Sequence, residues 1–193
     1  MTWRIGTAPT TAPDGEPVTV AECKLDSRID GTEFDTLIPA LITAAREMCE
    51  QETGRRLITQ TWRVTADEWP DDCDDTFVLS PFQSATVSYW NGTAWATLAT
   101  DQWTITDEAG ALLLQPAYGL TFPVLGDLVG PRVRVDVVCG YGAASAVPAS
   151  LKMWIRQHVA AMLRSPDGMG DDKKMAVLPY LARLIDPHKV YAA

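Results

Sequence analysis

A helical period of apolar residues marks the strongest predicted helix of the chain. Apolar side chains recur every three or four residues across 34–49, which is the stripe of an amphipathic helix. Asp30 or Thr32 is expected to cap its start, and Gly54 is expected to end it in a left-handed conformation. Pro39 would then fall about two turns inside, where it would kink the helix. This stripe predicts a core-facing helix.

Three further helices follow from capping and spacing. Thr19 with Glu22 three residues later forms a capping-box pattern, which predicts a short helix to about Arg28. A second strong apolar stripe predicts a helix near 148–164, with basic residues on its other side. The C-terminal tail is expected to contain a short helix starting at Pro179. Helices therefore lie at both ends of the chain.

Between these helices the period changes to the alternation of β-strands. Thr61–Ala66 alternates, and 132–138 alternates most clearly, with three valines on one face. Asn91-Gly92 joins two such runs and is a strong hairpin signal. The predicted strands also include a short one at 77–79 and two hairpins, at 85–98 and at 102–115. We expect six or seven strands in this block, antiparallel and connected by hairpins.

The order of these elements predicts an α+β fold. The N-terminal helices and the helix near 148–164 would form a small helical bundle, into which an antiparallel β domain is inserted. Residues 1–18, rich in Thr, Ala, Pro and Gly, are expected to be a flexible arm. The helical domain would comprise 19–59 and 147–193 with its C-terminal tail, and the β domain 60–146.

The charge distribution narrows the function classes. The formal net charge of −9 disfavours a surface that coats nucleic acid. Residues 1–146 hold 9 Lys/Arg and 21 Asp/Glu, whereas 147–193 hold 7 and 4. Such asymmetry indicates either a basic tail that docks on an acidic surface or an ordinary solvated helix face. No apolar stretch has the length of a membrane span, so no membrane partner is expected.

The chain lacks the residue patterns of catalysis. Its four cysteines are too far apart for a metal or redox pair, and they predict free, mostly buried thiols in a reducing compartment. His158 falls on the apolar face of its helix, and His188 lies in a short polar tail. No nucleophile elbow, phosphate loop or dinucleotide fingerprint occurs. We therefore predict that the protein is not an enzyme and uses no cofactor.

One acidic loop is the densest group of candidate ligands. Carboxylates are the ligands that Ca²⁺ and Mg²⁺ prefer, but the spacing here lacks the central Gly and distal Glu of an EF-hand. A solvated loop is the favoured interpretation, so no metal site is predicted. The residues of this acidic loop are Asp67, Glu68, Asp71, Asp72, Asp74 and Asp75.

Seven tryptophans are many for a chain of 193 residues. Trp62, Trp90, Trp95 and Trp103 fall on or near predicted strands. Tryptophans in such positions stack on bases or sugars, pack between a sheet and helices, or anchor protein interfaces. Because the chain is acidic, core or interface positions are the favoured interpretation.

Five short segments of the sequence stand in a distinctive order. They are residues 16–22 (EPVTVAE), 44–47 (AARE), 52–62 (ETGRRLITQTW), 137–142 (VVCGYG) and 147–151 (VPASL). In this combination, which is more specific than any one segment, they resemble phage head–tail connector proteins. The similarity covers about 16–165 and is closest to the adaptor subgroup with a β-rich insertion, found in phages, prophages and gene-transfer particles.

This resemblance implies a structural role in the virion neck. Such proteins form a ring beneath the portal, expected to follow its twelvefold symmetry, that extends the DNA channel and joins head to tail. The implied partners are the portal protein, neighbouring copies and the next neck or tail protein, with DNA passing through without specific binding. Synthesis would occur in the host bacterial cytoplasm. Portal contacts are expected in 173–193, with Tyr180, Leu184, His188 and Tyr191 as candidates.

The acidic loop has an expected place in this picture. An acidic channel wall lets DNA pass without sticking, because Lys and Arg contacts to phosphate are what hold DNA. We therefore expect the carboxylates at 67–75 to face the channel or its mouth. Two alternatives stay open: another neck or tail-completion protein, and a carbohydrate-binding β module that uses exposed tryptophans.

Overall fold

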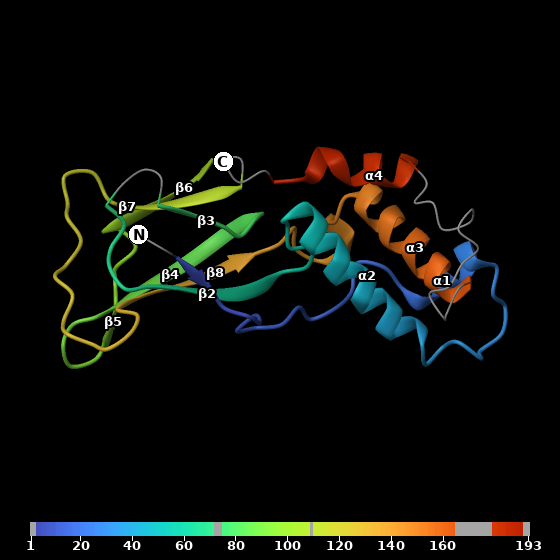
Figure 1. The fold of residues 1–193 in the computed structure, drawn as a ribbon, viewed down its shortest axis with the longest axis horizontal. Helices are drawn as coiled ribbons and strands as arrows, with labels where there is room; N and C mark the ends of the chain where they lie inside the picture. Colours follow the sequence, from blue (N-terminus) through green and yellow to red (C-terminus); the bar gives the residue numbers. More distant parts are fainter. Residues whose placement is uncertain (1–2, 72–74, 109, 165–178, 191–193) are drawn as a thin grey trace. The chain divides into compact units, whose positions relative to one another are not determined.

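The computed structural model describes residues 3–71, 75–108, 110–164 and 179–190, and the side chains of 179 and 180 are not described. The described parts have an α+β fold with helices and two antiparallel sheets (Figure 1). They divide into two compact units. The β unit comprises the described parts of Met1–Pro13, Thr59–Gly140 and Val190–Ala193, and the helical unit those of Asp14–Ile58 and Tyr141–Lys189.

The helical unit is organised around one long helix near its C-terminal end. This helix, α3, contacts the other three α-helices of the unit's described residues. Two 3₁₀ turns, η1 and η2, precede α3 and follow α4. The bounds are α1 Val20–Ser27, α2 Ile38–Thr53, η1 Ala144–Ala146, α3 Ala149–Arg164, α4 Pro179–Ile185 and η2 Asp186–His188.

The capping prediction for α1 is confirmed. The Thr19 side chain accepts from the Glu22 backbone N–H at 3.2 Å, and the Glu22 carboxylate accepts from the Thr19 backbone N–H at 2.7 Å. The Glu22 carboxylate accepts bonds from the Thr19 backbone N–H and from the Thr19 hydroxyl, and these lower the pKa of Glu22 because they favour its ionised form. Arg28 then ends the helix in the left-handed conformation, with φ 57°. The local sequence therefore sets the start of α1.

Helix α2 starts later than expected. Residues 33–37 form turns, closed by bonds such as the one from the Ile38 N–H to the Phe34 carbonyl, and the helix begins at Ile38 without a side-chain cap. The expected caps, Asp30 and Thr32, lie outside it. Pro39 occupies the first turn, so its missing N–H removes no helical bond, and the predicted kink is wrong. Gly54 ends the helix with φ 69°, as expected.

The core of the helical unit is apolar, with a charged group buried beside it. Ile38, Ile42, Leu151 and Ile155 are among its fully buried side chains. Glu50 on α2 is only 4% exposed. Its carboxylate lies 3.4 Å from Arg46 and 3.5 Å from Arg56, and it accepts the Leu57 backbone N–H at 2.9 Å. The buried charge is thus balanced by two guanidinium groups and one backbone donor.

The β unit is built from two antiparallel sheets. The larger has strand order β1-β2-β8-β4-β5, and the smaller β3-β7-β6. The predicted hairpins β4–β5 and β6–β7 are confirmed. The bounds are β1 Arg4–Ile5, β2 Gln60–Ala66, β3 Thr76–Val78, β4 Phe82–Trp90, β5 Trp95–Thr97, β6 Trp103–Glu108, β7 Ala111–Pro116 and β8 Val133–Cys139.

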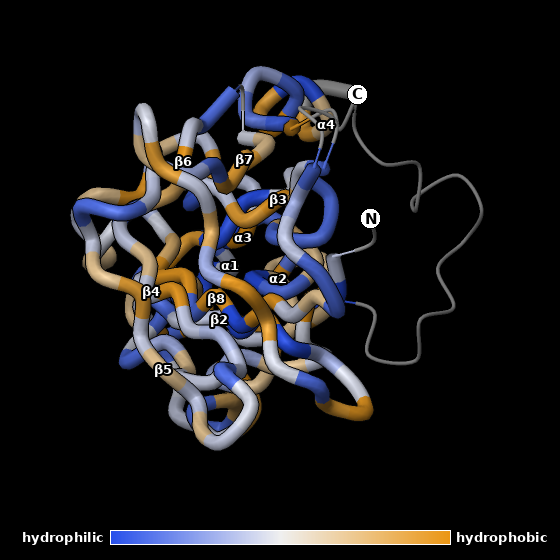
Figure 2. The backbone as a smooth tube through the Cα atoms, turned by 90° about the vertical axis from the view of Figure 1, so that its left-hand side faces the viewer, coloured by the Kyte–Doolittle hydropathy of each residue, from blue (hydrophilic) through white to orange (hydrophobic). Residues whose placement is uncertain are grey.

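Strand β8 joins parts of the chain that are far apart in sequence. It pairs with β2 on one side and β4 on the other, so its connections are not hairpins. Its three inward valines, at 133, 135 and 137, are completely buried in one cluster with Val64, Phe77 and Leu112. Figure 2 shows both hydrophobic and hydrophilic residues along the strands. The two sheets therefore share one apolar core.

The N-terminal segment differs from the expected flexible arm. Arg4 and Ile5 pair with Thr65 and Val64 at the edge of β2, and the Trp3 indole N–H donates to the Asp75 carbonyl at 2.9 Å. Thr11 bridges to Thr61. Unpaired edge groups of β2 supply partners that a composition rich in Thr and Pro does not reveal. Arg4–Ile5 thus form a short edge strand, and Thr11 adds an isolated bridge to the same edge of β2.

The boundaries between the units also differ by a few residues from those expected. The β unit reaches back to residues 3–13 and ends at Gly140. Residues 141–146, expected in the β domain, belong to the helical unit, where the Tyr141 N–H donates to the Leu57 carbonyl at 3.1 Å. Strand alternation stops at Cys139, so the pattern itself gave no sign of which unit the following turn joins.

Removing the buried carboxylate should destabilise the protein strongly. We expect Glu50→Ala to lower the free energy of unfolding by about 3–5 kcal/mol, because the buried Leu57 N–H loses its acceptor and Arg46, although it keeps Glu16 at 2.9 Å, loses a buried carboxylate. Glu47→Ala on the same helix is the matched control, since this side chain is 66% exposed and its contact with Arg46 is 3.5 Å. It should change stability by less than about 1 kcal/mol. Chemical denaturation measures both, and equal effects would contradict the assignment.

Candidate interaction surface

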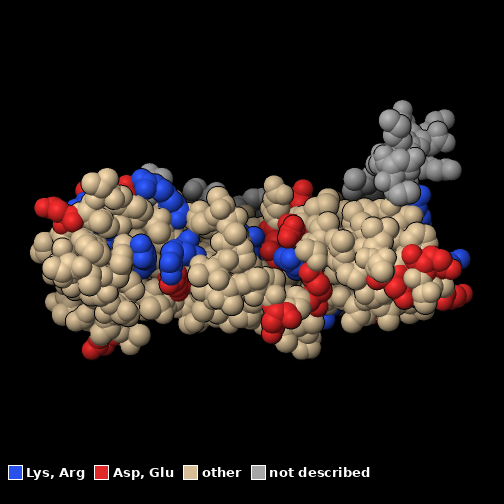
Figure 3. Space-filling view, turned by 90° about the horizontal axis from the view of Figure 1, so that it is seen from below, with Lys and Arg blue, Asp and Glu red and all other residues tan. Residues whose placement is uncertain are grey.

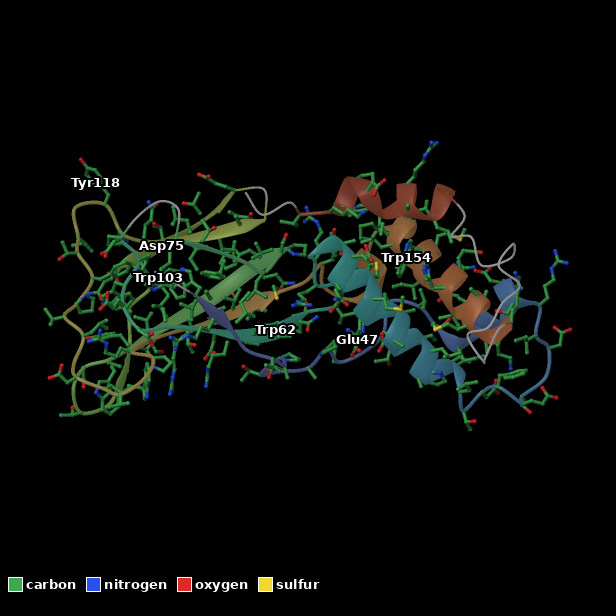
Figure 4. The ribbon with its side chains drawn as sticks, in the orientation of Figure 1. Glu47, Trp62, Asp75, Trp103, Tyr118 and Trp154 are labelled. Carbon is green, nitrogen blue, oxygen red and sulfur yellow. The ribbon has the colours of Figure 1, made fainter. Side chains whose placement is uncertain are left out.

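The loop between β7 and β8 exposes more large apolar side chains than any other described segment. Tyr118, Val124 and Val129 are 106%, 91% and 103% exposed. Leu120 and Leu128 in the same loop are also exposed. Figure 4 shows Tyr118 pointing away from the strands. We refer to residues 117–131 as the apolar loop. Apolar groups gathered in this way are typical of a surface that another protein covers.

Two tryptophans fasten the apolar loop to the sheet. Trp69 stacks on Phe122 with ring centroids 4.2 Å apart, and its indole N–H donates to the Pro123 carbonyl at 2.8 Å. The Trp90 indole N–H donates to the Asp127 carbonyl at 3.1 Å. Phe122 and Leu125 pack against the core of the β unit. The loop is therefore anchored on its inner side while its outer side chains stay in solvent.

A glycine contact fixes the tip of the loop against the β4–β5 turn. The Gly126 N–H donates to the Trp90 carbonyl at 2.9 Å. A Cβ at Gly126 would lie 2.1 Å from the Gly92 nitrogen, which no side chain tolerates. Only glycine permits this approach of two backbones. The exposed side chains are thus held on a preorganised backbone, which reduces the entropy lost on binding.

Polar groups border this apolar surface. One open hollow is lined by Asp127, Leu128, Val129 and Arg132. A second lies beside Trp69, Phe122 and Val124, with Glu68 and Asp71 at its edge. Apolar side chains surrounded by charged ones are the usual composition of a protein–protein contact. Neither hollow is enclosed as a small-molecule pocket is.

The acidic loop is partly neutralised within the β unit. Asp67 pairs with Arg4 at 2.6 Å, and its carbonyl accepts from Arg132 at 2.7 Å. Arg132 also lies 3.3 Å from Glu68, and the Asp71 N–H donates to the Asp75 carboxylate at 3.2 Å. Asp72 and Asp74 lie outside the described residues. Within the described part of the chain no group of three or more His, Cys, Asp or Glu side chains is arranged to hold a metal.

The candidate contacts in the C-terminal segment divide into described and undescribed residues. Leu184 packs against the core of the helical unit. The His188 ring lies 2.8 Å from the Ser150 hydroxyl, and the His188 carbonyl accepts from Arg55 at 2.6 Å. The Tyr180 side chain and Tyr191 lie outside the described residues. Leu184 and His188 thus help to hold this segment on its own unit.

The reactive side chains of the described residues serve structure. Burial raises the pKa of the Cys23 thiol to about 11 and that of Cys49 to about 12, so both stay protonated and unreactive near neutral pH. Cys139 is buried as well, whereas Cys73 is outside the described residues. His158 stacks on Trp154 at 3.6 Å and bonds to its carbonyl. Cys23, Cys49 and the ring of His158 are thus held by packing within the helical unit.

The tryptophans do not form a sugar-binding platform. All seven are described, and every one is buried or half-buried. Trp62 and Trp154 lie in the two cores, Trp3 packs edge-on to Phe77, and Arg134 covers Trp95. Carbohydrate recognition needs aromatic faces open to solvent. The structure therefore disfavours the carbohydrate-binding alternative and favours the core or interface interpretation.

Sequence reasoning missed the apolar loop. Its apolar residues follow neither the helical nor the strand period, and they are interspersed with Gly and Pro. Leu120, Phe122, Val124 and Val129 nonetheless form an unusually apolar stretch for a connection. A long connection rich in large apolar residues was the available signal.

No helix among the described residues is long and apolar enough to cross a membrane.

The burial of His188 predicts a pH dependence of stability. Burial, and secondarily the charge of Arg55, lower the pKa of His188, so the unfolded chain takes up this proton more readily than the folded one. The stabilisation is complete above the unfolded pKa of about 6.5 and is lost as pH falls below it. We expect the difference in free energy of unfolding between wild type and His188→Gln to shrink from about pH 8 to about pH 5. Urea titrations across this range measure it, and a constant difference would contradict the assignment.

Comparisons with known proteins give the fold but no family. No protein-family model and no curated protein matches the chain. Three solved chains are similar over 100% of this chain and 97% of their own length. One belongs to the neck of an empty gene transfer agent particle computed with C6 symmetry (19% identity, TM-score 0.77), and one to the virion of a native particle (21%, 0.77). The third belongs to the neck of a native particle computed with C12 symmetry (19%, 0.70). The chain therefore shares its whole fold with components of such particles.

Proposed function

We propose that this protein is a structural subunit of the neck of a tailed phage or phage-like particle. In this proposal it acts as a head–tail connector, or adaptor, that forms a ring under the portal, extends the DNA channel and joins head to tail. It is located in the virion, made in the cytoplasm of the bacterial host, and has no enzymatic role. A different neck or tail-completion protein is the alternative within the same class.

One observation carries this proposal. The fold matches chains of gene transfer agent particles from end to end, with TM-scores up to 0.77, and leaves no additional domain unmatched. Two of these chains come from necks computed with sixfold or twelvefold symmetry. Fold alone does not define function, so a site must support it. The apolar loop supplies that support, because it suits contact with another protein and contains no catalytic group.

The proposal assigns a role to each part of the chain. The helical unit would form the connector domain, and the β unit would be a domain inserted into it. The segment 173–193, including Tyr180, Leu184, His188 and Tyr191, would reach the portal. The acidic loop would face the channel or its mouth, where carboxylates keep DNA from adhering. Paired Asp67 and Glu68 would contribute less to this repulsion than the other carboxylates of the loop.

The apolar loop would contact a neighbouring protein of the neck. Val124 and Val129 expose their whole side chains, although the loop backbone is fixed by Trp69 and Trp90. Burial of such side chains stabilises a contact by about 25 cal/mol per Å² of apolar area, less the cost of association. A fixed loop lowers that cost. Leu128, next to the polar rim, would lie at the edge of the contact.

Electron microscopy of particles made without this gene tests the proposed function. We expect DNA-packed or leaking heads that lack tails, with free tails alongside. Complementation with the wild-type gene should restore tailed particles. Normal tailed particles in the deletion strain would show that the protein is not a connector.

Polar substitutions in the apolar loop should impair assembly without unfolding the protein. We expect the double variant Val124→Ser, Val129→Ser to complement the deletion at least about tenfold less well than wild type, which corresponds to about 1.4 kcal/mol of lost contact energy. Its thermal unfolding should stay unchanged, because both side chains are in solvent. Leu25→Ser is the matched control, since Leu25 is 75% exposed on α1 of the other unit. Counts of tailed particles decide the result, and full complementation by the double variant would exclude the loop contact.

A further inference from the structure

All the basic residues of the β unit lie on one face. The segments 1–13 and 59–140 contain four arginines and no lysine, against eleven acidic residues. The register places Arg4, Thr65 and Arg134 in one row across β1, β2 and β8, and Arg63 opposite Asp136 in the next. Arg132 precedes the inward Val133 and therefore points the same way. The outer face of the larger sheet is thus an arginine face on an acidic unit.

The space-filling view shows this segregation. Basic side chains gather over the β unit on the face seen in Figure 3, at the left of the view, with few acidic side chains among them. The opposite side of the same sheet is the apolar core, where Val64, Val87 and Val135 are completely buried. Strand alternation therefore sorts this sheet into one apolar and one basic surface.

Three of the four arginines are already engaged with acidic partners. Arg63 forms a bidentate pair with Asp136, at 2.7 and 2.8 Å. Arg4 pairs with Asp67 at 2.6 Å, and Arg132 contacts the Asp67 carbonyl and Glu68. These contacts hold the side chains in place. The acidic partners also neutralise much of the positive charge of these three arginines. Arg134 is therefore the arginine most available to a partner.

Arg134 is held by an aromatic ring instead of a carboxylate. Its guanidinium carbon lies 3.5 Å from the centroid of Trp95, and Trp90 packs edge-on to Trp95 with centroids 5.9 Å apart. Among the described residues no carboxylate comes within ion-pair distance of it. Burial, and then repulsion from Arg63, lower the pKa of Arg134 more than Asp136 raises it. The edge donors of this oriented guanidinium are therefore available to an incoming anion.

We propose that the arginine face, centred on Arg134 and Trp95, binds exposed carboxylates of a second copy of this chain. Charge complementarity supports this occupant, because the chain carries 25 acidic and 16 basic residues, so another copy offers more carboxylates than cations. The guanidinium of Arg134 is planar and holds two donors in parallel, so it can donate two hydrogen bonds to one carboxylate. A heterologous contact of this kind, basic face on acidic face, is what builds a ring or filament.

DNA is a poorer match for the same face. Binding to a phosphate backbone depends on many basic contacts, each of which releases counterions. Here a single open arginine stands on a unit with four basic and eleven acidic residues. A duplex laid on this face would meet repulsion from the surrounding carboxylates. The inference rests on the proposed function, because it assumes that copies of this chain form a ring. It adds to that function by naming one of the two surfaces through which neighbouring copies would meet.

Zero-length cross-linking of the full chain tests this inference. A carbodiimide joins lysine only to a carboxylate in direct contact, and the β unit contains no lysine of its own. We would introduce Arg134→Lys and mix unlabelled with ¹⁵N-labelled protein at high concentration, so that mass spectrometry distinguishes peptides joined between copies. The matched control is Thr106→Lys, at an exposed position on β6 of the smaller sheet. Circular dichroism checks that both variants fold.

We expect mixed-isotope peptides that join position 134 to Asp or Glu residues of another copy, at least about tenfold more abundant than those from position 106. They should decrease in high salt, because contacts between partly exposed charges are screened. Peptides joined only within one copy, or equal yields at both positions, would overturn the inference. A gel shift of duplex DNA by wild type that Arg134→Glu abolishes would also overturn it, in favour of a phosphate ligand.

The experiments can reject the connector role and the subunit contact at Arg134 independently of each other. Tailless particles in the deletion strain, without cross-links at position 134, would leave the connector role and remove this subunit contact. Normal particles in the deletion strain, with strong cross-links, would leave the self-contact and remove the connector role.

Discussion

Strand β8 is the element on which the β unit depends. It lies between β2 and β4 and contributes one surface to each side of the larger sheet. Because side chains alternate along a strand, its valines enter the core while Arg134 and Asp136 point outward. A shift of one residue would bury the charges and expose the valines, so the register is fixed by the cost of burying charge. The core and the arginine face are therefore two consequences of one alternation.

The arginine face and the apolar loop of the β unit differ in the partners that their side chains contact. On the arginine face most charges are paired within the unit, and the open group is a guanidinium supported by Trp95. On the apolar loop the backbone is satisfied by indole and amide donors, whereas Val124 and Val129 have no apolar cover. One surface is suited to an anionic partner and the other to an apolar one. A subunit with several neighbours needs such distinct surfaces.

Local patterns predicted the elements well, because capping and hairpin signals act over a few residues. The capping box at Thr19, the Asn91-Gly92 hairpin and the alternation of β8 all appear as expected. The predicted start of α2 was wrong because two local rules competed. An apolar stripe from Phe34 onward favoured a longer helix, but Pro39 fits best in the first turn. Of the two described C-terminal candidates, Leu184 packs on the core of its own unit and His188 bonds within it.

The sequence by itself determined which segments become helices and strands and which of their faces are apolar. It determined these because period, caps and turns depend on neighbours in the chain. Tertiary structure alone decided that Arg4, Ile5 and Thr11 pair with β2, that β8 lies between β2 and β4, and that four arginines distant in sequence share a face. It also decided that the apolar loop is fixed but uncovered, through Trp69 and Trp90. These features depend on strand pairing over long separations, where many pairings satisfy the same local pattern and only packing selects one.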